Sequence, residues 1–350
     1  ADGVGDFDFS RSGQATRVNK DGLIELVGSN IPRLNYPMID GVVSGCPSLL
    51  LEPERRNLVT YSEAFDNSYW IKNGSSVTSD FISPDGTANA FKLVENTTTA
   101  DHRIDAQSII TSSGSEYTLS MFLKKDGRSW FKLRDFITNA YINVNLSNGT
   151  IGSTNLVNNT QKIESFGNDW YKVSFTFTAS SSVALRLYIG ESDNDTSYTG
   201  NGTSGVYIWG AQLEEGSYPT SYIPTNGSSV TRLAETCTGA GDAATFNDSE
   251  GVLYADCKLL SNESTLTAIT ISDGTDQNRV IIDFGSALDR IRFFVISGGV
   301  ISYTYADTSF DLTSFNKLAI KYSLSDFSVD KLRTGAVSLV QINGADQRFK

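Results

Sequence analysis

Short runs in which apolar and polar residues strictly alternate are the feature that most constrains the fold. In residues 170–179, WYKVSFTFTA, four large apolar side chains alternate with Lys, Ser and Thr, and residues 116–125 and 183–190 show the same pattern. A period of two is typical of β-strands with one buried and one solvated face, so Ser174 and Thr176 are expected to face water. Turn residues separate the runs, and no long amphipathic helical pattern occurs. The sequence therefore predicts an all-β fold of the sandwich class.

Composition divides the chain of 350 residues into three regions. Residues 1–56 contain four of the seven prolines and only short strand-like pieces, which is typical of an extended lead-in. Residues 57–233 contain all four tryptophans and the clearest strands, and residues 234–350 resume the strand pattern after a connector rich in Gly, Thr and Ala. We expect two β-sandwich domains of the jelly-roll type, at 57–233 and 234–350, behind an N-terminal lead-in at 1–56.

The charge of the chain and its few metal-binding residue types argue against several functions. The formal net charge is −12, which disfavours a general affinity for nucleic acid or anionic membranes, and no run of about 18 apolar residues predicts a membrane span. The cysteines are Cys46, Cys237 and Cys257, and they form no CxxC pair, so a zinc site is not expected and free thiols are. The single histidine, His102, is expected to lie at the surface or at a sheet edge.

Catalytic patterns are also missing from the sequence. Glu214 and Glu215 are adjacent, and neighbours on a strand point to opposite faces, so they cannot act together across one glycosidic bond. We expect this pair to be a solvated strand end. No phosphate-binding loop, GxSxG or HExxH motif is present, which favours a protein that is not an enzyme. Trp70, Trp170 and Trp209 lie among apolar neighbours and are expected in the core.

The segment 190–205, GESDNDTSYTGNGTSG, is dense in Asp, Asn and Gly. Asp193 and Asp195 could supply oxygen ligands to a structural calcium ion, although the EF-hand offsets are absent. The alternative is a solvated loop without a metal, and no other cofactor is expected.

Aromatic, amide and cationic residues occupy the polar positions of three expected strands. Their alternation with apolar residues in 129–136, 140–146 and 183–190 places them on the faces that point away from the core. Aromatic rings flanked by such donors suit a sugar, whose apolar ring face stacks while its hydroxyl groups form hydrogen bonds. The alternative is that these residues cover a neighbouring loop or a neighbouring subunit. The candidate ligand-binding residues are Trp130, Arg134, Tyr141, Asn143, Arg186 and Tyr188.

The order of several motifs adds a resemblance to a known class of proteins. NLVTYSEAFDNSYWIKNGSSV at 57–77 is followed by YTLSMFLKK, FGNDWYKVSFTFTA and VYIWGAQLEEGSYPTSYIPT, the last at 206–225. Together with the lead-in, this stretch from about residue 10 to residue 233 resembles the jelly-roll domains, similar to carbohydrate-binding modules, of tailed-phage fibre, spike and adhesin proteins. Residues 249–350 resemble, more weakly, a concanavalin A or laminin-G sandwich. The family usually continues into further strands after a sequence like QING at 341–344, so we expect a domain that is shortened, cleaved, continued beyond Lys350 or completed by another chain.

The resemblance implies a non-catalytic structural protein at the virion surface, on a head or tail fibre or spike. Its partners would be other virion proteins, further copies of itself (three in a fibre) and a host-surface glycan, with neither nucleic acid binding nor membrane insertion. Residues 206–225 would then be a scaffold strand and its exit. Two alternatives stay open: a purely structural decoration or assembly protein, and an ancillary module of a polysaccharide-degrading enzyme.

Overall fold

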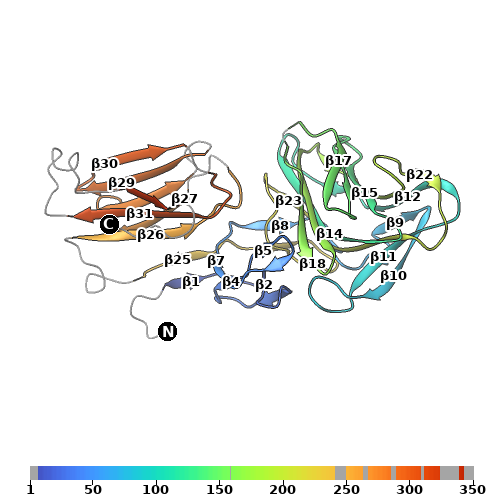
Figure 1. The fold of residues 1–350 in the computed structure, drawn as a ribbon, viewed down its shortest axis with the longest axis horizontal. Coiled ribbons are helices and arrows are strands. Elements are labelled where there is room, and N and C mark those ends of the chain that lie inside the picture. The colour runs from blue at the N-terminus through green and yellow to red at the C-terminus, as the bar shows by residue number, and fades with distance from the viewer. Residues whose placement is uncertain are drawn as a thin grey trace. The chain divides into compact units, whose positions relative to one another are not determined.

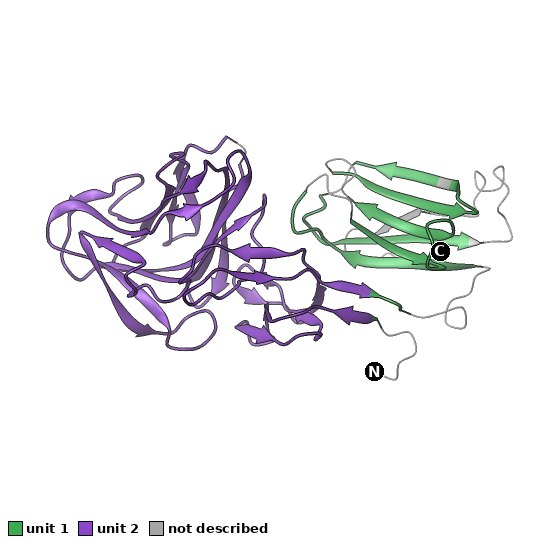
Figure 2. Cartoon of the chain, turned by 180° about the vertical axis from the view of Figure 1, so that it is seen from behind, with its two compact units in different colours: residues 1–7, 238–350 green, residues 8–237 purple. Residues whose placement is uncertain are grey.

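The computed structural model describes residues 7–157, 159–240, 250–262, 267–284, 289–308, 311–323 and 339–342. These residues form β-strands, turns and extended segments and contain no helix, so none of them forms a helix that could cross a membrane (Figure 1). The predicted all-β sandwich class is confirmed. The chain forms two compact units, residues 8–237 and residues 1–7 with 238–350 (Figure 2). The expected lead-in therefore belongs, from Asp8 onward, to the same unit as residues 57–233.

Two antiparallel sheets form the body of the unit 8–237 in the described part of the chain. The six-stranded sheet has the order β10 (Ser75–Phe81), β11 (Ala90–Glu95), β23 (Gly205–Glu215), β14 (Glu116–Asp126), β19 (Trp170–Thr178), β18 (Lys162–Gly167). The seven-stranded sheet has the order β17 (Thr150–Thr154), β16 (Tyr141–Asn145), β15 (Trp130–Asp135), β21 (Leu185–Gly190), β12 (Thr99–Ala106), β22 (Ser197–Thr199), and β9 (Trp70–Asn73) also pairs with β12. These two sheets are the layers of a sandwich.

The main core lies between the inward faces of the two sheets. Every second residue of β15, β16 and β21 contributes to it, including Phe131, Leu133 and Ile142, which are fully buried. Trp70 joins this core, whereas Trp170 and Trp209 are buried in a second cluster on the other face of the six-stranded sheet. The expectation that these three tryptophans are core residues is confirmed.

The six-stranded sheet is covered on both faces, which corrects the expectation of a solvated side. Ser174 and Thr176 of β19 are buried rather than solvated. The outer cluster contains Ile24 from the lead-in and Tyr222 from the segment after β23, packed with Phe122 of β14. The lead-in and the exit segment therefore cover this face in place of water. The alternation of residues within one strand cannot show that another segment covers the polar face.

Short paired strands build the rest of this unit. They are β1 (Asp8–Ser10) with β25 (Thr236–Thr238), β2 (Ala15–Val18) with β3 (Ile24–Val27), β4 (Arg33–Asn35) with β7 (Ser48–Leu50), β5 (Met38–Ile39) with β6 (Val42–Val43), β8 (Arg55–Asn57) with β24 (Val230–Arg232), and β13 (Ile109–Ile110) with β20 (Ser182–Val183). Two of these pairs join the lead-in to residues 230–238, so chain segments about 200 residues apart are held together here.

The second unit has two further sheets among its described residues. One is β26 (Glu250–Cys257), β31 (Asn316–Ser323) and β32 (Leu339–Ile342), and the other is β27 (Thr267–Ser272), β28 (Arg279–Phe284), β29 (Ile291–Ser297) and β30 (Val300–Asp307). Their apolar faces share a core that includes Phe293, Ile282 and Ile320. Cys257 lies against this core, and Cys46, Cys237 and Cys257 are all free thiols, as expected.

Candidate functional site

The outer face of the seven-stranded sheet brings together all six candidate ligand-binding residues. In one row across the sheet, Asp105 pairs with Arg186, Arg186 with Arg134, and Arg134 with Tyr141. In the next row, Arg103 pairs with Tyr188, Tyr188 with Lys132, and Lys132 with Asn143. We call this surface the outer face and define it by these residues: Trp130, Lys132, Arg134, Tyr141, Asn143, Arg186, Tyr188, Asp101, Arg103 and Asp105.

Trp130 begins β15 and is half-buried. Its ring lies over Gly152 of β17, where an added Cβ would come within 2.5 Å of the tryptophan Cζ3 and within 2.6 Å of Asp193 Oδ1. The Asp193 carboxylate accepts hydrogen bonds from the backbone N–H of Ser153 at 2.9 Å and from its hydroxyl at 2.8 Å. The glycine at 152 thus leaves the space that the indole ring occupies, and the hydrogen bonds of Asp193 fix Ser153 of β17 beside it.

Lys132 and Tyr141 form a cation–aromatic pair at the centre of the outer face. Lys132 Nζ lies 4.2 Å from the centre of the Tyr141 ring and donates to Asn194 Oδ1 at 2.7 Å. Partial burial, and next the positive charge of Arg134, lower the pKa of Lys132. The ammonium group is therefore partly withdrawn from water and fixed beside an aromatic ring, where such contacts gain strength.

Arg134 and Arg186 lie opposite each other on β15 and β21 and share the ring of Phe136. The guanidinium carbon of Arg186 is 3.4 Å from the centre of the ring, and that of Arg134 is 5.1 Å from it. Phe136 is 42% exposed. Its loop is held by the buried Asp135 carboxylate, which accepts hydrogen bonds from the backbone N–H groups of Ile137 at 3.2 Å and of Thr138 at 2.9 Å.

The carboxylates of the outer face are gathered around Arg103. Asp105 accepts from Arg103 Nε at 3.0 Å and from Asn73 Nδ2 at 2.9 Å, while Arg186 Nε lies 3.9 Å away. Asp101 lies 3.2 Å from Arg103 Nη1. Burial raises the pKa of Asp105, and the charges of Arg103 and Arg186 oppose that rise.

Tyr188 and Asn143 lie on the outer face but are covered by their neighbours. Tyr188 is 3% exposed, with the Arg103 guanidinium 5.6 Å from the centre of its ring. Asn143 is 2% exposed and donates from Nδ2 to the carbonyl oxygen of Ser153 at 2.9 Å. These two side chains are therefore buried beneath their neighbours and have almost no contact with water. Water reaches part of four others: Trp130, Arg134, Tyr141 and Arg186.

No family model and no curated protein matches this sequence. Several solved structures show a partial likeness, and two of them each match 45% of this chain. One is the enzymatically active domain of tailspike protein 4 of bacteriophage CBA120, at 15% identity, a TM-score of 0.28 and 21% of that chain. The other comprises the CBM22-1 and GH10 modules of the N-terminal endo-1,4-β-D-xylanase 10B of Clostridium thermocellum, complexed with xylohexaose, at 16% identity, a TM-score of 0.25 and 27% of that chain. The match spans less than a third of either protein, and at these TM-scores neither likeness carries a functional argument.

Four residues of the outer face were not among the candidates from the sequence, namely Lys132, Asp101, Arg103 and Asp105, and neither was Phe136 beside it. Lys132 and Phe136 share the parity of Trp130 and Arg134 in SWFKLRDF, so the alternation itself contained the signal for both. Arg103 belongs to DHRIDA, in which the charged positions 101, 103 and 105 alternate with buried ones.

The same alternation corrects the expectation for His102, which is fully buried rather than at the surface or at a sheet edge. It lies on the inward side of β12, which pairs with β21 on one side and with β9 and β22 on the other. Its ring nitrogens lie 2.6 Å from the carbonyl oxygen of Gly74 and 3.1 Å from that of Tyr198. These backbone contacts explain why a polar side chain is accommodated there.

Glu214 is also buried, which corrects the expectation of a solvated strand end, while Glu215 is exposed. The Glu214 carboxylate accepts from Gln212 Nε2 and from the backbone N–H of Thr220, both at 2.8 Å, and from the Thr220 hydroxyl at 2.6 Å. Burial raises its pKa. The glutamate fixes the turn that follows β23, and the two carboxyl groups of the pair lie in different environments.

The acidic loop at 190–205 gives Asp193 a partner within the protein, since Ser153 binds its carboxylate. Asp195 donates its backbone N–H to the carbonyl oxygen of Ser192 at 3.2 Å and closes a turn. Within the described ranges, no three His, Cys, Asp or Glu side chains gather into a group that could hold a metal ion.

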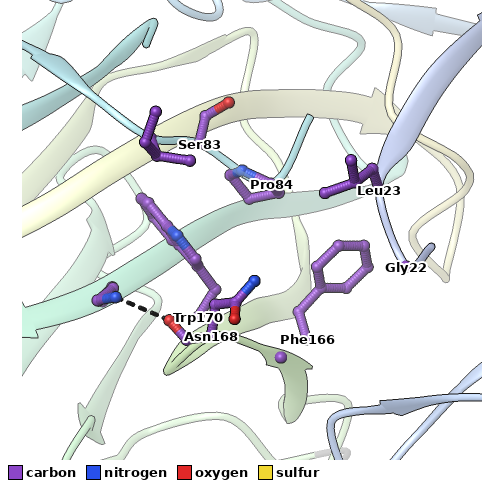
Figure 3. Close-up of a pocket in the computed structure, with 10 residues that line it drawn as sticks. Gly22, Leu23, Ser83, Pro84, Phe166, Asn168 and Trp170 are labelled. Carbon is purple, nitrogen blue, oxygen red and sulfur yellow. Dashed lines mark hydrogen bonds between the residues drawn. The ribbon is translucent and has the colours of Figure 1, made fainter. Parts of the chain in front are cut away.

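A pocket of about 140 Å³ lies on the opposite side of the unit, between the lead-in and the six-stranded sheet (Figure 3). Leu23, Pro84, Phe166 and Trp170 line it, and Lys124 donates to the carbonyl oxygen of Asn168 at 2.8 Å. Ligand pockets for small molecules usually start at about 300 Å³. This pocket is too small to rival the outer face as a functional site.

Proposed function

We propose that this protein is a non-catalytic structural component of a phage virion surface and that its outer face binds host-surface glycans. The binding is weak at each copy. It becomes effective when many copies on one particle engage the same cell, because linked sites raise the effective concentration of each binding partner.

The observation that carries the glycan part of this proposal is the grouping of aromatic rings and cations on one sheet face. Trp130, Tyr141 and Phe136 come from β15, β16 and the loop between them, and Lys132, Arg134 and Arg186 lie against or beside these rings. A sugar offers apolar C–H faces to aromatic rings and hydroxyl groups to guanidinium and ammonium donors. The virion part rests on the sequence motifs at 57–77 and 206–225.

A second candidate function is assembly, and the lead-in supports it. Several large apolar side chains of this segment are exposed: Phe7, Leu26, Ile31, Leu34, Ile39, Val42, Leu49 and Leu51. Ile39 and Val42 are paired on β5 and β6 and are 59% and 68% exposed. Apolar groups at such density are typical of surfaces that meet another protein. This surface would attach the protein to its particle and leave the outer face to bind glycans.

Purified phage particles provide the test. Mass spectrometry of the particles should detect the chain, and electron microscopy at residue resolution should show Trp130, Tyr141 and Phe136 facing solvent. Absence of the chain from the particles would overturn the virion assignment. An outer face sealed against another protein would overturn the glycan-binding function and leave assembly as the role of the protein.

A further inference from the structure

We propose that the glycan bound by the outer face is acidic, and that Arg134 and Arg186 bind its carboxylate. This inference rests on the proposed function and names the chemical class of its ligand.

The first observation is the direct juxtaposition of two like charges. Arg134 and Arg186 are cross-strand partners in the same row of the sheet. Like charges directly opposite each other destabilise a pair of strands. Acidic residues outnumber basic ones in this chain, 40 to 28, yet neither of these two paired positions carries an acid.

The second observation is that the carboxylates in reach are already engaged. Asp105 accepts from Arg103 and Asn73, and it approaches Arg186 only at 3.9 Å. Arg134 has no hydrogen bond and no ion pair with any described residue, and its buried Nε has no hydrogen-bond partner. No acid of the described chain therefore neutralises the Arg134 guanidinium, and a ligand carboxylate would supply the missing counter-charge.

The third observation is that both guanidinium groups lie over one aromatic ring, and that only Arg186 also forms an ion pair, the 3.9 Å contact with Asp105. The guanidinium carbon of Arg186 lies over the Phe136 ring at 3.4 Å from its centre, and that of Arg134 lies over the same ring at 5.1 Å. Stacking leaves the in-plane N–H donors of a guanidinium free, and these donors match the two oxygens of a carboxylate. Tyr141, the next residue in the row, supplies an aromatic ring for the sugar that bears the acid.

The test compares acidic saccharides with neutral versions of the same molecules. Titration calorimetry of the full chain would use oligogalacturonate, hyaluronan oligosaccharide and alginate oligosaccharide, each beside its carboxyl-reduced counterpart. We expect at least one acidic member to bind about tenfold more tightly than its reduced form, because charge-assisted hydrogen bonds are about twice as strong as neutral ones. This preference should shrink as salt is raised from about 50 to about 500 mM, since mobile ions screen exposed charges.

Variants locate the effect and separate the two proposals. Arg134→Gln and Arg186→Gln should remove the preference for the acid and keep the weak binding of the reduced form. Arg56→Gln removes the same charge from an exposed arginine that binds Ser229, and it should change nothing. Unfolding curves of all three would show that they are folded. Equal binding of acidic and reduced forms, or a preference that survives both substitutions, overturns this inference and leaves the proposed function standing. No binding to any member of the panel overturns both.

Discussion

Arg33 and Glu235 lie 202 residues apart in the sequence and meet as a fully buried ion pair, in which Arg33 Nε donates to Glu235 Oε1 at 2.7 Å. Arg11 binds the same carboxylate at 2.6 Å, and Glu52 lies 2.9 Å from both Arg33 and Arg232. Five buried charges therefore join the lead-in to β24 and to the segment that follows it. Such a network specifies where the lead-in docks, because a charge left unpaired in this interior would be costly.

We predict that Glu235→Gln lowers the free energy of unfolding of residues 8–237 by about 3 kcal/mol, because Arg11 stays buried without its counter-charge and Arg33 keeps only Glu52, which it shares with Arg232. Chemical denaturation followed by tryptophan fluorescence measures this loss, since all four tryptophans lie in this unit. The matched control is Glu215→Gln at an exposed position, which should leave stability almost unchanged. A loss of less than about 1 kcal/mol for Glu235→Gln would mean that the network behaves like a surface ion pair.

We predict that ionised Glu52 stabilises the fold and that this contribution is lost in acid. Burial alone would raise its pKa, but the charges of Arg232 and Arg33 and the hydrogen bonds from Ser221 outweigh burial and lower the pKa below 4.5. The unfolded state then binds more protons below pH 4.5, so the contribution of Glu52 is complete above that pH and is lost as pH falls. Glu52→Gln should be less stable than the parent at pH 7, and the difference should narrow in unfolding curves at pH 4 and pH 3. A difference that stays constant between pH 7 and pH 3 would contradict this assignment.

For Glu214 we predict the opposite dependence of stability on pH. Burial raises its pKa above 4.5, so the folded state holds the proton more firmly and stability falls as pH rises through that window. Glu214→Gln mimics the protonated form and does not titrate. Its stability relative to the parent should therefore increase from pH 4 to pH 7, as measured by thermal unfolding at each pH. A relative stability that decreases over the same range would show that the ionised carboxylate is the favoured form.

We predict that the position of the Trp130 ring depends on the glycine at position 152 of β17. Gly152→Ala places a methyl group 2.5 Å from the Trp130 ring and should push the ring outward. The other three tryptophans are at most 3% exposed, so quenching of fluorescence by acrylamide reports on Trp130, and we expect quenching to increase. Gly45→Ala is the control, because nothing lies within 4 Å of the added carbon there. Unchanged quenching in Gly152→Ala would mean that the ring does not depend on this glycine.

The sequence predicted the faces of the central strands because alternation reports directly which side chains share a side. Residues 129–136, 140–146 and 183–190 obey it, and it brought Arg134, Arg186 and Tyr141 onto one surface.

What alternation could not predict is what lies on top of a face. Ser174 is buried because the six-stranded sheet is covered on its outer side, where Ile24 packs about 150 residues away in the chain. Tyr188 is covered by Arg103 from β12, and Asn143 by the backbone of β17. These covers come from other strands and segments of the chain, so a pattern within one strand cannot show them.

A glycan microarray tests the central claim most directly. The full chain, multimerised on a carrier to reproduce multivalent display, would be compared with the double variant Trp130→Ala/Tyr141→Ala and with the control Ile110→Ala, an exposed residue on β13. The account predicts that the parent and the control bind the same saccharides and that the double variant, although folded, loses them. Saccharide binding that survives the double substitution would contradict the assignment of the outer face as the binding site.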